Sequence, residues 1–455
     1  MESPASRACG IHAGRLNLAQ YAANFADAHP PLNRTQALIE AERCYYCYDA
    51  PCTTACPTGI DVPAFIARIA QDNVRGAARE ILTANPLGGM CSRVCPTEQL
   101  CEQACVRNTN EDKPVEIGAL QRYATDGFMA SGGPALFVRQ PATGKKVAVV
   151  GAGPAGLTCA HQLALEGHEV VLLDAKPKLG GLNEYGLASY KTPDDFAQKE
   201  IDWLLSVGGI TPHNNQRLGR DFTLDSLLAK YDAVFLGLGL AGVNALGVPE
   251  PEVPGVRNAV DFIADIRQAS DKSTVPVGRR VVVIGGGMTA VDAAVQAKLL
   301  GAEEVTMFYR RGKAALSASA VEQEWAQTHD VSLRLWATPQ QVLTENGLLA
   351  GIRMAYTREH NGKLEVTDEV FDVPADMVLK AIGQTYVAQP AGAAIQLRQG
   401  RIDTDAQGQT SVPRVWAGGD CRAGGKDLTV EAVEHGKVAA RAMHQVLMGT
   451  VGVKA

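Results

Sequence analysis

The pattern of apolar and polar residues changes along the chain, from helical spacing near the N-terminus to strand–turn–helix units further on. Apolar residues recur at helical spacing in 63–69 and 75–82, within a first region that is otherwise irregular. After a Gly/Pro-rich stretch at 131–144, short apolar runs enter glycine-rich turns and are followed by helical segments. The pattern therefore predicts a helical N-terminal domain, then a linker, then an α/β fold.

Two strand–turn–helix units are clear in the later region. In the first, the run KVAVV at 146–150 enters a glycine turn, and a helical segment leads to a strand at 169–173. In the second, RVVVI at 280–284 enters a similar turn and leads to a strand at 304–309. Such a duplication is typical of paired dinucleotide-binding folds. The strand-like and helical patterns after residue 381 are expected to return to the first fold and complete it.

A G-x-G-x-x-G turn lies between the first strand and its helix. Glycine permits the tight turn and lets backbone N–H groups approach a pyrophosphate, which the helix N-terminus also attracts. Asp174 ends the next strand, 18 residues after Gly156, where an acid would bind ribose hydroxyls. Turn, helix and acid together predict a dinucleotide site. The predicted contacts in the turn are Gly151, Gly153, Pro154, Ala155 and Gly156.

Features further along the chain favour FAD in this first site. A double glycine follows the acid in the stretch KLGGL, and AGGD ends a strand before a helix near the C-terminus. This arrangement resembles the two-dinucleotide flavoproteins, in which that aspartate contacts the ribityl–phosphate region and the helix N-terminus faces the flavin ring. Glu431, Glu434 and His435 on this helix are expected on a solvated face. The further predicted FAD contacts are Gly180, Gly181, Leu182, Gly419, Asp420, Thr429 and Val430.

The second glycine turn predicts a nicotinamide site. Its expected contacts are Gly285, Gly286, Gly287 and Thr289. After the following strand, an acid would pair with the 2′-hydroxyl of NAD, whereas arginines would accommodate the 2′-phosphate of NADP. The chain has Arg310 and Arg311 there, which favours NADP(H) on chemistry alone. The alternative is that these arginines pair with nearby acids or with the adenine ring.

Cysteine is concentrated near the N-terminus, where eight of the 11 cysteines lie between Cys44 and Cys105. An odd total without an export signal argues against a disulfide framework. The spacings are C-x₂-C-x₄-C-x₃-C-P and C-x₃-C-P-x₄-C-x₃-C. Eight cysteines, two of them before proline, fit two 4Fe–4S clusters better than zinc, which normally uses two CxxC pairs for one site. Spacing alone leaves open which cysteines belong together.

From about residue 15 to its end, the chain resembles the glutamate synthase small-subunit superfamily, through the stretches CYYCYDAPCTTACPTGIDVPAFI, NPLGGMCSRVCPTEQLCEQAC and IGALQRYATD. The likeness is closest to the N-terminal half of dihydropyrimidine dehydrogenases and to their separate bacterial electron-input subunits. Position by position, the resemblance implies a first cluster held by Cys44, Cys47, Cys52 and Cys105. It implies a second cluster held by Cys56, Cys95, Cys101 and Gln121.

Gln121 lies where dihydropyrimidine dehydrogenases use a glutamine ligand and glutamate synthase small subunits typically have glutamate. A neutral amide makes the cluster site less negative, which should raise its potential. Cys91 is then left without a cluster, and we interpret it as a packing thiol. Lys191 lies where the family commonly has an arginine near the flavin; it keeps the charge and loses the planar fork.

Two other departures from the family pattern bear on the nicotinamide. Met288 replaces a polar residue often found in the turn, and Ser317 replaces a further arginine of the NADPH-using dehydrogenases. The bacterial two-subunit relatives are associated with NADH. The resemblance therefore favours NADH as the electron donor, whereas the chemistry of the arginine pair alone favours NADPH.

The fold class predicted is α/β, with an N-terminal α-helical iron–sulfur domain followed by two Rossmann-like dinucleotide-binding domains. The expected segments are 1–140 for the helical domain with two 4Fe–4S clusters, 141–270 and 381–455 for the two parts of the FAD-binding domain, and 271–380 for the NAD(P)H-binding domain. A net charge of −6 without basic clusters argues against a nucleic-acid partner. No run approaches the roughly 18 apolar residues of a membrane helix, and no signal peptide is evident, so we expect a cytoplasmic protein.

Together these features predict electron flow from NAD(P)H through FAD and the two clusters to an external acceptor, with no side chain acting as nucleophile or base. The resemblance implies a partner subunit with FMN and iron–sulfur centres that reduces uracil or thymine to the 5,6-dihydro form, since the sequence shows neither an FMN phosphate site nor a (β/α)₈ barrel. One alternative is a glutamate synthase small subunit or a related NADPH–ferredoxin-type oxidoreductase. Another is a non-catalytic assembly or cluster-carrying subunit, which the intact glycine turns disfavour.

Overall fold

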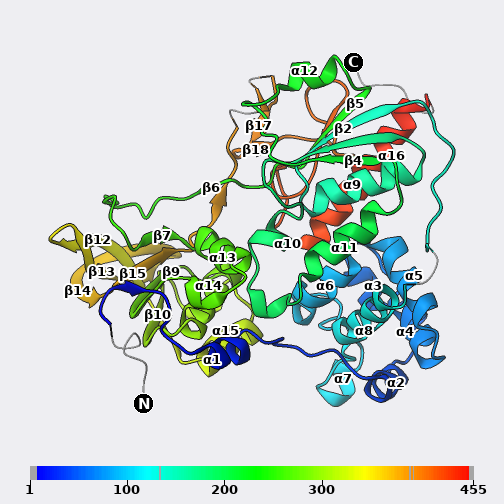
Figure 1. The fold of residues 1–455 in the computed structure, drawn as a ribbon. Coiled ribbons are helices and arrows are strands. Elements are labelled where there is room, and N and C mark those ends of the chain that lie inside the picture. Colours follow the sequence, from blue (N-terminus) through cyan, green and yellow to red (C-terminus); the bar gives the residue numbers. More distant parts are fainter. Residues whose placement is uncertain (1–7, 133–134, 389–390, 393, 450–455) are drawn as a thin grey trace. The chain divides into compact units, whose positions relative to one another are not determined.

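The computed structural model describes residues 8–132, 135–388, 391–392 and 394–449, and the chain divides into two compact units (Figure 1). The larger, here called the cysteine unit, draws its described residues from His29–Glu184, Asp194–Ala241 and Tyr386–Ala455. The smaller unit draws them from Met1–Ala28, Tyr185–Pro193 and Gly242–Thr385. Each unit contains one of the two glycine turns, so each is described by itself.

The N-terminal half of the cysteine unit is helical, as the apolar spacing predicts. The apolar positions of 63–69 and 75–82 fall in α4 and α5, where Phe65, Ile66 and Ile81 are fully buried. With Leu120 of α8 they form one core, against which cysteines of both predicted sets pack. The helices are α2 (Arg34–Glu42), α3 (Pro51–Ala55), α4 (Val62–Ala70), α5 (Val74–Ala84), α6 (Gly88–Val94), α7 (Asn108–Glu111) and α8 (Ile117–Ala130).

The rest of the cysteine unit is a parallel sheet in the order β19-β5-β2-β3-β4. Its strands are buried apolar runs because helices cover the sheet. Helix α16 lies beside α9 along one face, and α12 packs under the other (Figure 1). The elements are β2 (Lys146–Val150), α9 (Pro154–Leu165), β3 (Glu169–Leu173), α11 (Phe196–Leu205), β4 (Ile210–His213), α12 (Leu224–Leu228), β5 (Ala233–Leu236), β17 (Leu397–Arg398), β18 (Arg401–Ile402), β19 (Val415–Ala417) and α16 (Thr429–Leu447); α10 (Leu182–Tyr185) crosses into the smaller unit.

The smaller unit has a second parallel sheet, in the order β11-β10-β9-β15-β7. Helices α13 and α14 cover one face, and the antiparallel sheet β12-β13-β14 packs near the other. The elements are β1 (Ile11–His12), α1 (Leu18–Asn24), β6 (Gly242–Val243), β7 (Val256–Asn258), α13 (Ala259–Gln268), β8 (Val277–Gly278), β9 (Arg280–Ile284), α14 (Met288–Leu299), β10 (Glu304–Tyr309), α15 (Ala320–Thr328), β11 (Val331–Leu335), β12 (Ala337–Glu345), β13 (Leu348–His360), β14 (Lys363–Pro374), β15 (Met377–Lys380) and β16 (Gln384–Thr385).

The predicted fold class is confirmed: helices precede two Rossmann-like folds, and the strands expected at 146–150, 169–173, 280–284 and 304–309 have those bounds. The segment before Ala28 packs with the second fold, because the buried Arg15 donates to the carbonyl of Val277 at 3.0 Å. The division into four segments by residue number stays a prediction. Within the described residues, no helix combines the length and apolar character needed to cross a membrane.

Candidate functional site

The first glycine turn has the geometry of a phosphate-binding turn. Gly151 has φ +94°, and a Cβ there would lie 2.2 Å from the carbonyl oxygen of Gly237. A Cβ at Gly156 would lie 1.8 Å from the carbonyl oxygen of Gly151. Helix α9 begins at Pro154, directly after Gly153, so its unpaired N–H groups face the turn. The structure thus explains Gly151 and Gly156 by steric exclusion, and the turn fits a pyrophosphate.

Asp174 is tied to this turn directly. Its carboxylate accepts the N–H of Ala152 at 2.6 Å and the N–H of Lys176 at 2.8 Å. Burial raises the pKa of Asp174, and these two backbone hydrogen bonds oppose that shift. The acid expected at the end of the second strand therefore stands beside the glycine turn, as ribose binding requires.

The KLGGL stretch folds back onto the same turn. Gly180 donates its N–H to the carbonyl of Ala152 at 2.8 Å. Gly181 has φ +55°, and a Cβ there would lie 2.7 Å from the Cα of Gly153. Leu182 follows as the first residue of α10 and is partly exposed. Glycine is required here because two backbone segments approach each other closely.

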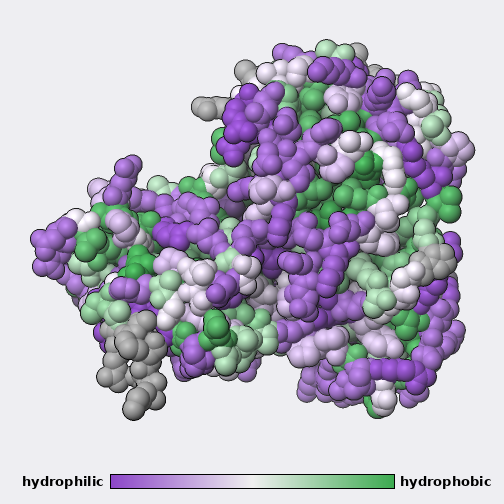
Figure 2. Space-filling view, in the orientation of Figure 1, coloured by the Kyte–Doolittle hydropathy of each residue, from purple (hydrophilic) through white to green (hydrophobic). Residues whose placement is uncertain are grey.

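The C-terminal AGGD segment and helix α16 complete this site. A Cβ at Gly419 would lie 3.3 Å from the Cβ of Ala155. Burial, followed by the charge of Asp427, raises the pKa of Asp420 to about 6. Thr429, the first residue of α16, donates its hydroxyl to Asn183 Oδ1 at 2.7 Å, and Val430 is buried. In this region Figure 2 shows hydrophobic side chains gathered over the sheet and α9, bordered by hydrophilic ones. The residues predicted to bind FAD are thus brought together within one unit, apart from Lys191.

Two residues of α16 have roles that the sequence reasoning missed. His435 is not on a solvated face: its Nδ1 accepts the N–H of Gly419 at 3.3 Å, and burial, with the charge of Arg422, lowers its pKa to about 4. Gly436 lets α16 approach α9, since a Cβ there would lie 2.3 Å from the carbonyl oxygen of Ala155. In the sequence, a glycine at this position inside a helical pattern was the feature that could have predicted close packing of the two helices.

The second glycine turn repeats the geometry in the smaller unit. Gly285 has φ +148°, and a Cβ there would lie 2.2 Å from the carbonyl oxygen of Ala381. Gly287 caps α14, so Thr289 lies in the first helical turn. The carbonyl of Gly286 accepts the N–H of Ser317 at 3.1 Å, which places Ser317 beside the turn. These contacts fit a second dinucleotide.

The arginine pair follows β10, at the edge where the second ribose is expected. Arg310 and Arg311 are both exposed, and within the described residues neither forms an ion pair. The backbone carbonyl of Arg310 accepts the hydroxyl of Thr357 at 2.8 Å, which fixes the chain at this point. Their guanidinium groups are therefore available for an external anion.

Lys191 belongs to the smaller unit, in the short 3₁₀ turn Ser189–Lys191. Its Nζ lies 2.8 Å from Asp292 Oδ1 of α14 and 2.7 Å from Glu322 Oε1 of α15. Burial alone lowers the pKa of Lys191, but the two carboxylates outweigh it and raise that pKa. The structure thus gives Lys191 an anchoring role on the second fold. Its predicted place near the flavin stays a prediction.

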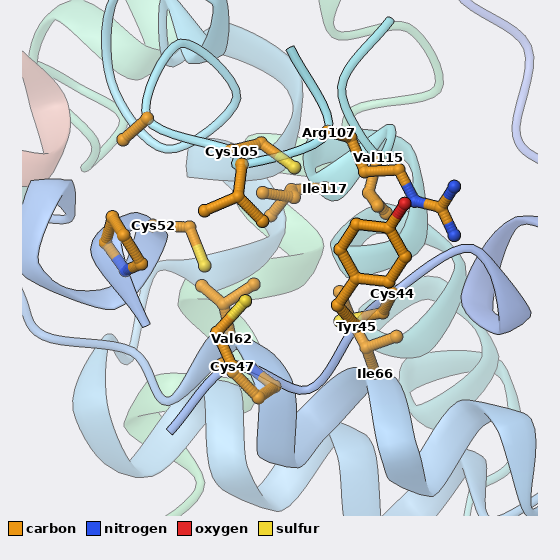
Figure 3. Close-up of a pocket in the computed structure, with 14 residues that line it drawn as sticks. Cys44, Tyr45, Cys47, Cys52, Val62, Ile66, Cys105, Arg107, Val115 and Ile117 are labelled. Carbon is orange, nitrogen blue, oxygen red and sulfur yellow. The ribbon is translucent and has the colours of Figure 1, made fainter. Parts of the chain in front are cut away.

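The first predicted cysteine set surrounds one pocket. Cys44, Cys47, Cys52 and Cys105 line it together with apolar side chains such as Val62 and Ile117. Figure 3 shows the sulfurs of Cys47, Cys52 and Cys105 turned toward the same space. Burial and the neighbouring charges of Cys44 and Cys105 raise the pKa of Cys52 to about 11. Four thiols converging on a largely apolar pocket fit a 4Fe–4S cluster.

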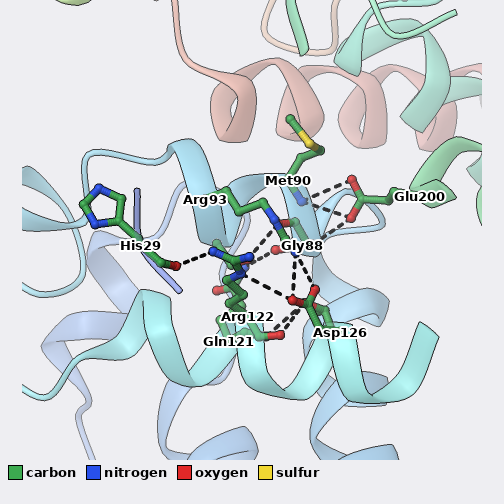
Figure 4. A network of polar contacts seen from close by, with 11 residues as sticks. His29, Gly88, Met90, Arg93, Gln121, Arg122, Asp126 and Glu200 are labelled. Carbon is green, nitrogen blue, oxygen red and sulfur yellow. Dashed lines mark hydrogen bonds and ion pairs between the residues drawn. The ribbon is translucent and has the colours of Figure 1, made fainter. Parts of the chain in front are cut away.

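The cysteines of the second set are partly buried, like those of the first. The adjacent Cys91 side chain, followed by burial and the nearby Cys101 and Cys56, raises the pKa of Cys95. Gln121 is 7% exposed and donates its Nε2–H to the carbonyl of Gly88 at 2.6 Å (Figure 4). This hydrogen bond orients the amide, since the nitrogen is used and the oxygen stays free to act as a ligand. The structure thus places the Gln121 amide at the start of α6, the helix that ends at Cys95, and the joint ligand set stays a prediction.

Donor spacing bears on the choice between a cluster and a single ion. Within the described residues, no three or more His, Cys, Asp or Glu side chains are placed to hold one metal ion. A 4Fe–4S cube bonds each ligand to a different iron, so its ligands stand further apart than those of one tetrahedral zinc.

The second set is also tied to the flavin fold, by two buried ionisable groups that the sequence reasoning missed. Glu200 of α11, fully buried, accepts the N–H of Gly89 at 2.7 Å and that of Met90 at 3.1 Å (Figure 4). Lys437 of α16 donates to the carbonyl of Thr58 at 2.9 Å, two residues after Cys56. No local pattern could reveal these contacts, because the partners are far apart in sequence.

The first set instead lies beside a surface hollow lined by Tyr46, Cys47, Tyr48, Asp49 and Asp61, among others. Tyr48 is fully exposed and Tyr46 is partly exposed. Arg107 stacks on the ring of Tyr45 at 3.9 Å and covers one side of the cluster pocket. A surface hollow thus adjoins the first set through Cys47.

Family models match two parts of the chain. Residues 21–133 match dihydropyrimidine dehydrogenase domain II, 4Fe-4S cluster, and residues 145–436 match the pyridine nucleotide-disulphide oxidoreductases. The chain is similar to the NAD-dependent dihydropyrimidine dehydrogenase subunit PreT of Salmonella typhimurium, 35% identical over 90% of this chain and 94% of the relative. It is also similar to the glutamate synthase [NADPH] small chain of Escherichia coli, 34% identical over 91% and 92%.

Among solved structures, the chain is similar to Mycobacterium tuberculosis FprA in complex with NADPH. The TM-score is 0.57 at 18% identity, covering 70% of this chain and 87% of that one. At this identity the likeness shows the fold alone. The family models confirm the predicted cofactor classes, which are FAD, NAD(P)H and 4Fe–4S clusters.

Proposed function

The chain belongs to the family of FAD- and iron–sulfur-containing electron-input subunits that includes the dihydropyrimidine dehydrogenase subunit PreT, and we propose that it oxidises NAD(P)H for a partner that reduces uracil or thymine to the 5,6-dihydropyrimidine. The observation that supports this choice is the buried Gln121, whose amide is oriented by the carbonyl of Gly88 at the start of α6, the helix that ends at Cys95. A glutamate synthase small subunit is expected to have glutamate at this position.

The chain's own residues would bind and orient the cofactors. The first glycine turn and the N-terminus of α9 would hold the FAD pyrophosphate, with Asp174 at the ribose. The N-terminus of α16 would stabilise negative charge at the ring by its dipole. FAD supplies the conversion of a two-electron hydride into single electrons.

We place the second cluster between the flavin and the first cluster. Glu200 and Lys437 tie the second set to helices of the flavin fold, whereas the first set lies beside a surface hollow. Electrons would then pass from FAD to the second cluster, to the first cluster and out. The buried apolar surroundings of both sets keep water away from the sulfurs and thereby tune the potentials.

The external acceptor is proposed to be an FMN- and iron–sulfur-containing catalytic subunit in a hetero-oligomer. Its docking surface is the hollow with Tyr46, Tyr48 and Asp49, because this surface is closest to the outer cluster and carries exposed aromatic side chains. The carboxylates of Asp49 and Asp61 predict a basic surface on that subunit. Neither nucleic acid nor membrane is proposed as a partner, and the proposed location is the cytoplasm.

NADH is proposed first as the electron donor, on family likeness. The exposed, unpaired guanidinium groups of Arg310 and Arg311 are the observation in favour of NADPH. The same pair, together with the glutamate synthase relative, supports the second candidate function, a glutamate synthase small subunit.

One anaerobic experiment separates these possibilities. The tagged chain is purified from its native host with whatever subunit accompanies it, and oxidation of NADH and of NADPH is followed after adding uracil, or glutamine plus 2-oxoglutarate. Uracil-dependent oxidation is expected and identifies the nicotinamide in the same trace. Oxidation only with glutamine and 2-oxoglutarate would mean that the chain is a glutamate synthase small subunit. Bound FAD and reduction of an artificial acceptor would exclude a non-catalytic assembly subunit.

A further inference from the structure

Lys437 is a buried cation on α16, only 5% exposed. Its Nζ donates to the backbone carbonyl of Thr58 at 2.9 Å and lies 2.8 Å from Glu434 Oε2, three residues earlier on the helix. Burying an ammonium group is unfavourable even when it is paired, and an apolar side chain would fill a packing position on a helix more easily. The burial of this charge therefore points to a role beyond packing.

Thr58 connects the lysine to the second cysteine set. Thr58 is buried, and its hydroxyl oxygen lies 3.3 Å from the Sγ of Cys56, which is within hydrogen-bond distance for sulfur. A cysteine that binds iron does so as a thiolate, which can only accept a hydrogen bond, so the Thr58 hydroxyl is then the donor. Thr58 thus bonds a predicted cluster ligand through its side chain and Lys437 through its backbone carbonyl.

Helix α16 is fixed at this point by contacts of three successive residues. The ring of His435 accepts the N–H of Gly419, which belongs to the predicted FAD site. A Cβ at Gly436 would lie 2.3 Å from the carbonyl oxygen of Ala155, so α16 packs tightly against α9 here. Lys437 follows directly and contacts the turn after α3. The helix that borders the predicted FAD site therefore also places a positive charge beside the second cysteine set.

We propose that Lys437 and Thr58 raise the reduction potential of the second cluster and so favour electron transfer to it from the flavin. The inference rests on the proposed ligand set, in which Cys56 binds that cluster. A nearby positive charge and a hydrogen bond to a ligand sulfur both stabilise the reduced, more negative cluster. Because Lys437 is buried, water and salt screen its charge little. Both are positioning residues, since they act on the cluster through its ligand and its surroundings.

Glu434 provides the means to separate this role from a structural one. Its side chain is partly exposed and pairs with Lys437, so it offsets part of the lysine charge. Removing the carboxylate and removing the ammonium group should therefore shift the potential in opposite directions. A contact that only tethers α16 to the turn after α3 would not reverse sign, because both changes weaken the same ion pair.

The test is a redox titration of the full chain, purified anaerobically and followed by EPR, with iron and FAD measured in every sample. Cys56→Ser is expected to lose about half of the iron, and the EPR signal that disappears identifies the second cluster. Lys437→Met should shift the one-electron equilibrium of this cluster about tenfold toward the oxidised form, a potential lower by about 60 mV. Glu434→Gln should raise the potential.

Thr58→Val removes the hydroxyl and keeps the backbone carbonyl, so it should lower the potential, with a change of about threefold in the same equilibrium. Thr58→Ser keeps the hydroxyl and is expected to restore the wild-type value. Arg441→Met, at an exposed cation one turn further along α16, is the matched control and should leave the potential unchanged, because water screens that charge. The first cluster should titrate as in the wild type in every variant.

An unchanged potential of the second cluster in Lys437→Met, or a lowered one in Glu434→Gln, would overturn the proposal and leave Lys437 as a tether only. Full iron in Cys56→Ser would also overturn it, because Cys56 would then be no ligand. If Lys437→Met loses iron or FAD, the opposite shifts expected for Glu434→Gln and Thr58→Val decide the matter. Since the titration uses the isolated chain, failure of the complex to reduce uracil would count against the proposed function and leave this result standing.

Discussion

The two cysteine sets share one helical core but differ in their surroundings and in their predicted ligand type. The first set has four thiols around a pocket beside a surface hollow, with Tyr48 fully exposed nearby. The segments that carry the second set are bonded to helices of the flavin fold by Glu200 and Lys437, and the amide of Gln121 is its predicted fourth ligand. On this difference we propose that the second set is an inner relay site and the first an outer exit site.

The largest effect is expected from removing an inner ligand. Cys101→Ser should lose about half of the iron and reduce uracil-dependent NAD(P)H oxidation by the complex to background, because the inner site is the proposed relay from the flavin. Reduction of an artificial acceptor that takes electrons from FAD should persist. Cys159→Ala, at a buried thiol in the core of the flavin fold, is the control and should retain both activities. Unchanged uracil-dependent oxidation in Cys101→Ser would show that the inner site is not the relay between the flavin and the outer site.

The next effect concerns the pH dependence of the inner site. Burial raises the pKa of Glu200 from its ordinary value of 4.5 to about 8, against the opposing hydrogen bonds from Met90 and Gly89. As the pH rises, this carboxyl loses its proton in the unfolded chain before it does so in the folded one. The contribution of Glu200 to the free energy of unfolding is therefore greatest below pH 4.5 and falls until about pH 8. The slope is at most about 1.4 kcal/mol per pH unit.

Glu200→Gln tests that slope, since its amide oxygen can still accept the backbone N–H groups and cannot ionise. Urea unfolding of the holoprotein between pH 5 and pH 8 should give a flatter dependence for the variant than for the wild type. Glu80→Gln, at a partly exposed carboxylate of α5, is the control. Equal slopes in Glu200→Gln and wild type would show that Glu200 is ionised throughout.

At the outer site, Tyr48→Ser is expected to weaken partner docking. The KM for the separately purified partner subunit should rise by about tenfold, equivalent to about 1.4 kcal/mol, because an exposed aromatic contact is lost. Reduction of an artificial acceptor that takes electrons from FAD should be unchanged, since Tyr48 is not itself a predicted cofactor contact. Val138→Ser, at an exposed apolar residue elsewhere in the cysteine unit, is the control. An unchanged KM in Tyr48→Ser would show that the partner subunit does not dock on the surface around Tyr48.

The smallest expected effect comes from changing the predicted amide ligand of the inner site to a carboxylate. Gln121→Glu should lower the potential of the inner cluster by about 60 mV, a tenfold shift in a one-electron equilibrium, because a carboxylate adds negative charge. A mediated redox titration of the isolated chain measures this shift. A higher potential in the variant would show that residue 121 does not act on the cluster through its charge.

Local patterns predicted both glycine turns, the strands that enter them and the two groups of cysteines, since each depends on residues close in sequence. The antiparallel sheet β12-β13-β14 was not anticipated, and neither was the packing of Arg15 against β8, because both need partners fixed by tertiary structure. The same holds for Glu200 and Lys437, whose backbone partners lie more than 100 residues away. Gln121 was identified only through family resemblance, since an isolated glutamine on a helix has no local signature.

The most direct test of the contrast between the two sites is a ⁵⁷Fe Mössbauer spectrum of the anaerobically purified wild-type chain. The account predicts about eight iron atoms in two 4Fe–4S clusters, with seven iron sites bonded to cysteine and one bonded to oxygen. Two clusters with only cysteine ligation, or a chain that carries zinc in place of iron, would contradict it.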